Sequence, residues 1–315
     1  MAFQIDPEVG AAMAALFGDS PPPPPPAGDV DTRRVNFNGL LEALSQSAPI
    51  PEDVKTEDFS ATTPDGHKLL LRWFTPPEGV RGPAIYYTHG GGMIVGSVDL
   101  YEGMLKRQVK AAGVPFLAVD YRLAPEFPHP TPVEDCYAGL TWMAENAQRL
   151  GVDPSRIAIM GDSAGGGLAA GTALMARDRG GPALAKQILI YPMLDDRNTV
   201  LDEAIAPFLV WSYDDNLTGW GALLGEARGS ADVSPYAAPA RATELAGLPP
   251  AYIDVGDLDA FRDEDVAYAQ RLIAAGVPTE LHVHPGCPHA FEVLAPQADV
   301  STRVMSDRFR AIRSV

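Results

Sequence analysis

Short apolar runs alternate with longer amphipathic segments along most of the chain. Apolar residues recur at helical spacing from Ile5 to Phe17, and the prolines Pro21–Pro26 must end that helix. We interpret the prolines as a stiff spacer before a second helical segment at Val35–Leu44, with a ligand for a proline-binding partner as the alternative. The pattern predicts that residues 1 to about 52 form helices outside the main sheet.

Eight strand-like runs follow, and helical patterns separate the later ones. The runs are Phe59–Thr62, Leu69–Phe74, Ala84–Thr88, Phe116–Tyr121, Ile157–Met160, Ile188–Tyr191, Ala251–Val255 and Glu280–His284. The helical patterns cover Tyr101–Ala112, Val133–Leu150, Gly165–Arg177 and Asp263–Ala275. We expect the first two runs to pair as a hairpin. The later alternation is typical of a mostly parallel sheet covered by helices on both faces, so the predicted class is α/β.

A connection of about sixty residues joins the strands at Tyr191 and Ala251, where a few residues would suffice. We interpret residues 193–233 as an insertion that, with the N-terminal helices, caps one edge of the core. The chain then divides into cap helices (1–52), a first core part (53–192), the cap insertion (193–233) and a second core part (234–315). In the insertion, Phe208 and Trp211 are candidates for lining a substrate pocket, and packing between cap and core is the alternative.

Charge and composition exclude several classes of function. Forty-one acidic and 24 basic side chains give a formal net charge of -17, which repels nucleic acid and anionic lipid surfaces. No apolar stretch approaches the roughly eighteen residues of a membrane span, and Met1–Phe17 lacks the basic start of a secretion signal, so we expect a cytoplasmic protein. Two distant cysteines, Cys136 and Cys287, form neither a disulfide framework nor a metal cluster.

The segment Gly161-Asp162-Ser163-Ala164-Gly165 fits the pattern G-x-S-x-G. A strand-like run ends just before it, and a helix of small residues begins just after it. This order is typical of a sharp turn that presents a nucleophilic serine, with the N-terminus of the helix beside it. The sequence therefore predicts Ser163 as a nucleophile.

A second glycine-rich segment, His89-Gly90-Gly91-Gly92, follows the strand at Ala84–Thr88. It matches the HGGG-type element whose backbone N–H groups stabilise an oxyanion. We expect the N–H groups of Gly90, Gly91 and Ala164 to form that oxyanion hole. His89 precedes the glycines, so its predicted role is structural.

The acid and the base should follow the serine in the order Asp or Glu, then His. His289 lies in the loop beyond the last strand, whereas the other histidines lie within that strand or well before the serine. His289 is therefore the predicted base. The loop after Ala251–Val255 offers Asp257 and Asp259 as acids, and the motif position favours Asp259.

In this order the motifs resemble those of the bacterial hormone-sensitive-lipase-like (family IV) carboxylesterases, from about residue 55 to the C-terminus. The corresponding segments are His89–Gly92, Asp120–Glu126, Gly161–Gly166, Asp259–Glu264 and Gly286–Phe291. The family pattern around the acid, G-x-x-D-P-L-R-D-E, selects Asp259. Two positions depart from the family: Ala260 replaces the usual proline, and Met93 replaces a frequent phenylalanine, a change that would widen an acyl pocket.

The resemblance implies an α/β-hydrolase fold with a helical cap and a carboxylesterase that needs no cofactor and no metal. It implies a triad of Ser163, Asp259 and His289 that hydrolyses small esters with short to medium acyl chains. A lipase or an amidase is the alternative within the fold. A ligand-binding homologue of the same fold without catalysis is the other alternative, since the plant gibberellin receptors resemble the same family but lack the histidine. The resemblance also implies a structural role for Arg122 and Glu126, which could pair, and a possible homodimer through Glu280–His284.

Overall fold

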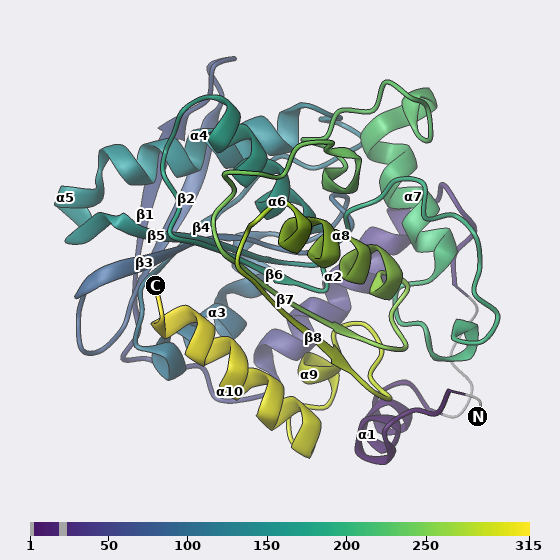
Figure 1. Ribbon diagram of the computed structural model, residues 1–315. Helices are drawn as coiled ribbons and strands as arrows, with labels where there is room; N and C mark the ends of the chain where they lie inside the picture. Colours follow the sequence, from purple (N-terminus) through teal and green to yellow (C-terminus); the bar gives the residue numbers. More distant parts are fainter. Residues whose placement is uncertain (1–2, 19–23) are drawn as a thin grey trace.

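The computed structural model describes residues 3–18 and 24–315, so Pro21–Pro23 of the expected spacer lie outside the described residues. One sheet of eight strands runs through the molecule in the order β1-β2-β4-β3-β5-β6-β7-β8 (Figure 1). β1 and β2 pair antiparallel as the expected hairpin, β2 also pairs antiparallel with β4, and every other neighbouring pair is parallel. The prediction of a mostly parallel α/β sheet is confirmed.

All eight strands appear where the apolar runs predicted them, with ends that differ by a few residues. Their bounds are β1 Lys55–Thr62, β2 Lys68–Thr75, β3 Gly82–Thr88, β4 Phe116–Val119, β5 Val152–Asp162, β6 Lys186–Ile190, β7 Ala251–Gly256 and β8 Thr279–His284. β8 is an edge strand, and a homodimer through it stays a prediction.

Helices cover both faces of the sheet, and alternate strand residues form a separate core on each face. Their bounds are α3 Val98–Ala112, α4 Thr131–Glu145, α5 Ala147–Leu150, α6 Ala164–Asp178, α8 Arg262–Ala274, α9 Phe291–Leu294 and α10 Asp299–Arg313. Tyr86 and Ile159 pack with α4, α6 and α8, whereas Tyr87 and Met160 pack with α3 and α10. In Figure 1 these two groups of helices lie above and below the sheet. The period-two pattern of a strand buried on both faces explains this division.

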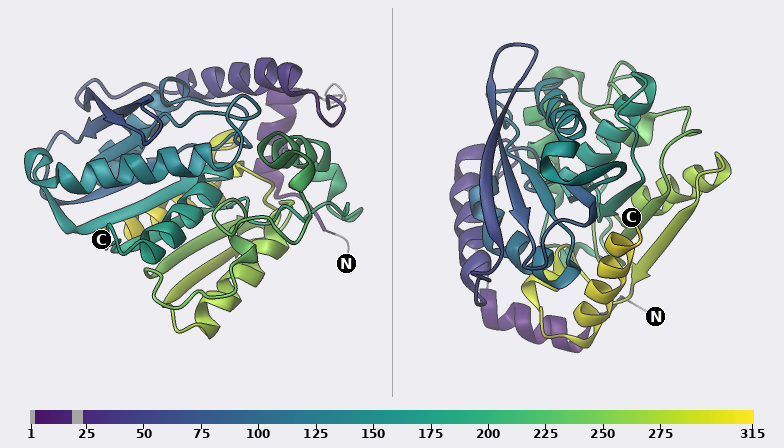
Figure 2. Two further views of the ribbon diagram at one scale, coloured as in Figure 1. Left: turned by 90° about the horizontal axis from the view of Figure 1, so that it is seen from above. Right: turned by 90° about the vertical axis from the view of Figure 1, so that its left-hand side faces the viewer.

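The N-terminal segment forms two helices outside the sheet, α1 (Pro7–Phe17) and α2 (Val30–Gln46). α1 packs beside α9, and the N–H of Asp6 donates to the carbonyl of Gly286 at 2.8 Å (Figure 2). α2 crosses α3 and contacts α7 (Tyr213–Leu224), the main helix of the connection between β6 and β7. The N-terminal helix α2 and the connection 193–233 therefore lie near one another, and the four-part domain division stays a proposal.

Two helices differ from the expectation. The pattern at Val133–Leu150 is divided into α4 and α5 at Asn146, whose backbone N–H and side-chain amide both donate to the carbonyl of Trp142. A side chain that competes for a backbone carbonyl in this way interrupts a helix. The C-terminal helix α10 was not predicted, because its buried side contains polar residues such as Ser301 and Arg308 among the apolar ones. Among the helices of residues 3–18 and 24–315, none has the length and apolar character needed to span a membrane.

Candidate active site

Ser163 lies on a sharp turn between β5 and α6, with φ 56° and ψ −123°. The turn requires glycine on either side. A Cβ atom at Gly165 would lie 2.1 Å from the carbonyl oxygen of Thr88, and one at Gly161 would lie 2.3 Å from that of Gly165. The N–H of Ser163 donates to the carbonyl of Ile190 at 2.8 Å, so the neighbouring strand holds the strained residue in place. The predicted strand, turn and helix are all present.

His289 lies in the loop after β8, directly beside Ser163. Its Nε2 atom is 3.0 Å from Ser163 Oγ, and its Nδ1 atom is 2.6 Å from Asp259 Oδ2. The other carboxylate oxygen of Asp259 accepts the N–H of Phe261 at 3.0 Å, which fixes the carboxylate. An aspartate that accepts from Nδ1 leaves Nε2 free to accept the serine proton. The three side chains form one hydrogen-bonded chain and are almost fully buried.

The other aspartates near this loop point elsewhere. Asp257 accepts the N–H of Gly286 at 2.7 Å and so ties two loops together. Asp254 pairs with Arg308 of α10, and Asp263 pairs with Arg262 at the surface. Among these aspartates, Asp259 is the one that contacts the imidazole.

The charge around His289 favours its protonated form. Burial opposes protonation, but the carboxylates of Asp259, Glu292 and Asp162 outweigh it, so the pKa of His289 lies above its usual value. Asp162 is buried and accepts hydrogen bonds from Tyr87 and Tyr101; burial nevertheless raises the pKa of this carboxyl. An imidazole in these surroundings is well suited to accept and return a proton.

The glycine-rich loop after β3 lies next to the turn at Ser163. Gly91 has φ +117°, and its carbonyl accepts the N–H groups of Ile94 and Val95, which closes the loop. A Cβ atom at Gly90 would lie 2.5 Å from a carboxylate oxygen of Asp162, so this loop and the nucleophile turn are in close contact. Ala164 is the first residue of α6, where a backbone N–H has no partner within the helix. The arrangement suits a hole for an oxyanion.

His89 packs against the glycine-rich loop and does not contact Ser163. Its Nδ1 atom is 2.8 Å from the carbonyl of Gly90, its ring stacks on Tyr121 at 4.2 Å, and the hydroxyl of Tyr121 donates to the His89 carbonyl. The pairing of Arg122 with Glu126 is absent from the structure. Arg122 instead pairs with Asp135 and Asp65, because these carboxylates face its guanidinium, and Glu126 pairs with Arg34 of α2.

A largely apolar cavity opens at Ser163 and His289 and extends beneath α2. Trp211 lines it, packs against Phe37 at 5.3 Å and covers Gly92. Met93 is fully buried in the core and Phe208 is half-buried in a short 3-10 helix; neither belongs to the residues that line this cavity. The sequence reasoning missed the lining residues of α2, which are Phe37, Leu40, Leu41 and Leu44. Their helical spacing was the available signal.

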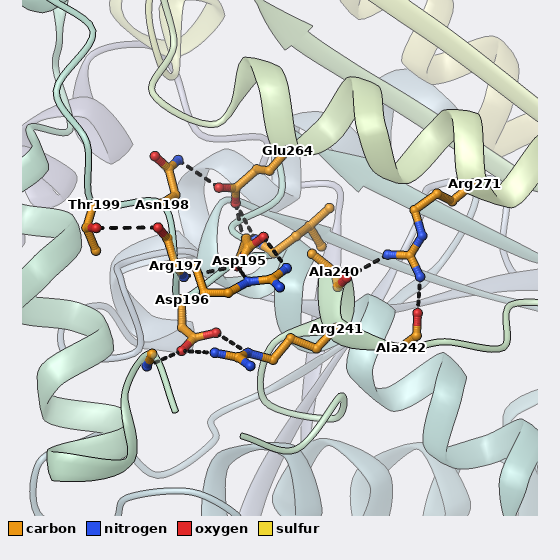
Figure 3. A network of polar contacts seen from close by, with 12 residues as sticks. Asp195, Asp196, Arg197, Asn198, Thr199, Ala240, Arg241, Ala242, Glu264 and Arg271 are labelled. Carbon is orange, nitrogen blue, oxygen red and sulfur yellow. Dashed lines mark hydrogen bonds and ion pairs between the residues drawn. The ribbon is translucent and has the colours of Figure 1, made fainter. Parts of the chain in front are cut away.

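A polar network joins the start of the connection between β6 and β7 to Glu264 of α8, which follows the loop of Asp259 (Figure 3). Glu264 accepts the N–H groups of Leu194 and Asp195 at 2.6 and 3.1 Å and the side-chain amide of Asn198 at 2.7 Å. That amide also donates to the carbonyl of Ala260 at 2.8 Å, next to Asp259. This bond fixes the loop at the position where the resembled family has proline.

The comparisons with known proteins agree with this geometry. A family model described as the alpha/beta hydrolase fold matches residues 85–293. Esterase LipI of Mycobacterium tuberculosis is 36% identical over 296 residues, which cover 90% of this chain and 91% of that protein. Carboxylesterase NlhH of the same organism is 39% identical over 304 residues, which cover 94% and 93%.

A solved structure of a bacterial heroin esterase superposes with a TM-score of 0.88 at 38% sequence identity, covering 99% of this chain and 98% of that chain. A hyperthermophilic esterase from Pyrobaculum calidifontis follows with a TM-score of 0.84 at 32% identity and covers 99% of each chain. The chain therefore belongs to the α/β-hydrolase family and, within it, to the hormone-sensitive-lipase-like carboxylesterases that its motifs resemble.

Proposed function

We propose that the chain hydrolyses small carboxylic esters with short to medium acyl chains, through an acyl-enzyme intermediate on Ser163. The proposal depends chiefly on one observation, the continuous hydrogen-bonded chain from Ser163 through His289 to Asp259 at the mouth of an apolar cavity. The names of the relatives, esterase and carboxylesterase, support the same reaction.

In the first step, Ser163 Oγ bonds to the acyl carbon while its proton passes to His289 Nε2. Asp259 stabilises the imidazolium and remains ionised. The tetrahedral intermediate then collapses, the bond to the alcohol oxygen breaks, and the alcohol leaves with the proton from His289. Water then attacks the acyl carbon while His289 accepts its proton. The second tetrahedral intermediate collapses, the bond to Ser163 Oγ breaks, and the carboxylic acid leaves as Ser163 regains a proton from His289.

The negative oxygen of each tetrahedral intermediate would accept hydrogen bonds from the N–H groups of Gly90, Gly91 and Ala164. Such donors lower the barrier by about 3 kcal/mol each when they are held in place before the reaction. The positive end of α6 points at the same oxygen and contributes in the same direction. The neighbouring cavity is apolar and covered by α2, which suits a small acyl group better than an extended lipid surface.

The decisive experiment replaces Ser163 with Ala and measures turnover of short acyl esters of a chromogenic phenol. We expect activity to fall by about six orders of magnitude, because the residual rate then depends on binding and the oxyanion hole alone. A fluorophosphonate should label the unchanged protein and not the variant. Ser155→Ala, at an exposed serine, is the matched control. Activity of the Ser163 variant at a tenth of the original rate would exclude Ser163 as the nucleophile.

A series of acyl chains from acetyl upward tests the substrate class. We expect kcat/KM to be highest on the short or medium chains, because the cavity ends against side chains of α2 and α3. A maximum found only on insoluble long-chain triglycerides would refute this part of the proposal.

A further inference from the structure

A second group of buried charged residues lies beside His289, apart from the proposed triad. Glu292 of α9 pairs with Arg308 of α10 at 2.5 Å, and Arg308 binds both oxygens of Asp254 in β7 at 2.7 Å. All three side chains are less than a tenth exposed. Two carboxylates around one guanidinium leave one net negative charge in the interior of the molecule, where charges interact more strongly than in water.

Tyr191 connects this group to the imidazole. The hydroxyl of Tyr191 donates to Glu292 Oε1 at 2.7 Å, and the Tyr191 ring meets the His289 ring edge-on at 4.5 Å between centroids. The guanidinium carbon of Arg308 lies over the same ring, 5.4 Å from its centroid. Tyr191 also has φ +34°, and its N–H donates to the carbonyl of Asp254 at 2.7 Å. Tyr191 thus has a backbone conformation that is uncommon for tyrosine, and its ring is contacted on several sides.

Only one of the two carboxylate oxygens of Glu292 accepts hydrogen bonds from the described residues. Its Oε1 atom accepts from Tyr191 and Arg308, whereas Oε2 is buried without a hydrogen-bond partner among the described residues. A carboxylate whose charge is only partly compensated exerts a field on its neighbours. His289 lies three positions earlier in the chain and within reach of that field, as the contribution of Glu292 to its raised pKa indicates.

We propose that Glu292 is a positioning residue for the general base, since it holds the Tyr191 ring against His289 and places a second buried negative charge beside the imidazole. The inference rests on the proposed role of His289 as the base. Asp259 then fixes the tautomer through Nδ1, while Glu292 stabilises the imidazolium from a distance and restricts the ring through Tyr191. This role goes beyond the triad, because Glu292 touches neither the serine nor the substrate carbonyl in the proposed reaction.

The groups that surround His289 come from five parts of the chain, and the three carboxylates among them raise its pKa. They are Asp162 at the end of β5, Tyr191 after β6, Asp259 between β7 and α8, Glu292 in α9 and, across the Tyr191 ring, Arg308 in α10. Asp162 is hydrogen-bonded through both oxygens, and Asp259 through both of its own. Glu292 is the carboxylate whose charge can be removed while its two hydrogen-bond donors keep an acceptor.

The test replaces Glu292 with Gln and measures kcat and KM against pH, with the number of active sites counted by fluorophosphonate labelling. We expect the acid limb of kcat/KM to move to lower pH by about 0.5 to 1 unit, because an imidazolium without this neighbouring charge loses its proton more easily. On the plateau kcat should fall by about 5 to 20 fold, because the imidazolium formed in the reaction is less stable, and this fall should exceed any rise in KM that follows from the place of Glu292 in the cavity wall.

Tyr191→Phe separates the two parts of the role. It keeps the ring and the Glu292 charge and removes only the hydroxyl that fixes the ring. We expect a lower kcat with the acid limb unmoved. Asp307→Asn is the matched control, since it removes a partly exposed carboxylate next to Arg308 in α10 and should change neither quantity.

An unshifted acid limb and an unchanged kcat per labelled site in the Glu292 variant would overturn the inference and leave Glu292 with a purely structural role. If that variant fails to fold, an unchanged kcat in Tyr191→Phe overturns it equally. Failure of the proposed function is distinguishable, because the unaltered protein would then neither turn over esters nor accept the fluorophosphonate label.

Discussion

Individual buried carboxyl groups differ greatly in the number of hydrogen-bond donors and counterions that surround them. Glu264 has three hydrogen-bond donors around it, and Asp196 has the guanidinium of Arg241 and the N–H of Gly229. Asp265 in α8 is fully buried, and neither of its oxygens has a partner among the described residues. Burial without compensation is costly for a charged group, so Asp265 should be a local weakness of the fold.

This weakness predicts a specific dependence of stability on pH. Burial, together with the charges of Glu264, Asp259 and Asp254, raises the pKa of Asp265 well above its usual value. The folded state therefore binds a proton that the unfolded state releases above a pH of about 3.9. The contribution of this group is fully present below that pH and is lost as the pH rises through the raised pKa.

Asp265→Asn removes the titrating group and keeps its shape. We expect the free energy of unfolding at neutral pH to rise by about 1 to 3 kcal/mol, and by much less near pH 4. Urea unfolding at several pH values measures this. Asp263→Asn, at the neighbouring exposed position, is the control. If Asp265→Asn shows the same slope of stability against pH as the unaltered protein, Asp265 is not the source of the weakness.

At the scale of elements, one arginine links α2 and α7, two helices that lie far apart in the sequence. Arg33 of α2 is fully buried; its guanidinium binds Asp215 of α7 at 2.7 Å and the carbonyls of Pro25, Pro26 and Asp29. Asp215 also belongs to the capping box at the start of α7. The contact between the N-terminal segment and the insertion therefore includes a buried ion pair, besides the packing of Phe37 on Trp211.

Arg33→Ala should loosen both helices, because it leaves the buried carboxylate of Asp215 without its counterion. The expected loss of stability is about 3 to 5 kcal/mol. Because α2 lines the cavity, KM should rise more than kcat falls. Hydrogen exchange of α2 and α7 amides, together with KM, provides the measurement. Arg179→Ala, which breaks an exposed pair with Glu134, should cost about 1 kcal/mol or less, and an equal loss in the two variants would contradict the argument.

At the scale of the whole molecule, the C-terminal helix α10 covers the face of the sheet that points down in Figure 1. Arg308 compensates two buried carboxylates, Ala311 and Ile312 belong to the core on that face, and the terminal carbonyl of Val315 accepts from Arg156. The last helix of the chain therefore contributes both to the apolar core on that face and to the group of buried charges beside the proposed base.

A chain that ends at Ala298 should consequently fail to fold cooperatively. It would expose one apolar face of the sheet and leave Asp254 and Glu292 without a counterion, an effect that exceeds the usual stability of a domain of about 5 to 15 kcal/mol. Thermal unfolding followed by near-UV circular dichroism tests this. Arg310→Ala, at an exposed position of the same helix, should retain the cooperative transition. A cooperative transition in the shortened chain would show that α10 is dispensable.

Local patterns were sufficient for the main elements. Each strand of the parallel part is an apolar run, and the turn at Ser163 requires glycines at fixed positions, so both are visible without any knowledge of contacts. The order of serine, acid and base along the chain selected His289, whose Nε2 lies 3.0 Å from Ser163 Oγ. The residues of α2 that line the cavity were not identified, because a helical apolar stripe looks the same whether it packs on a core or on a cavity.

The sequence by itself therefore determined the class of fold, the family and the motifs at Ser163 and His289, because these depend on periodicity and on steric demands within a few residues. The family pattern had already favoured Asp259 over Asp257, and only the tertiary structure decided that Arg122 binds Asp135 and Asp65. It also decided that Glu292, Tyr191 and Arg308 meet beside His289. Burial and pairing of charges depend on distances between residues remote in the chain, and those distances exist only once the chain has folded.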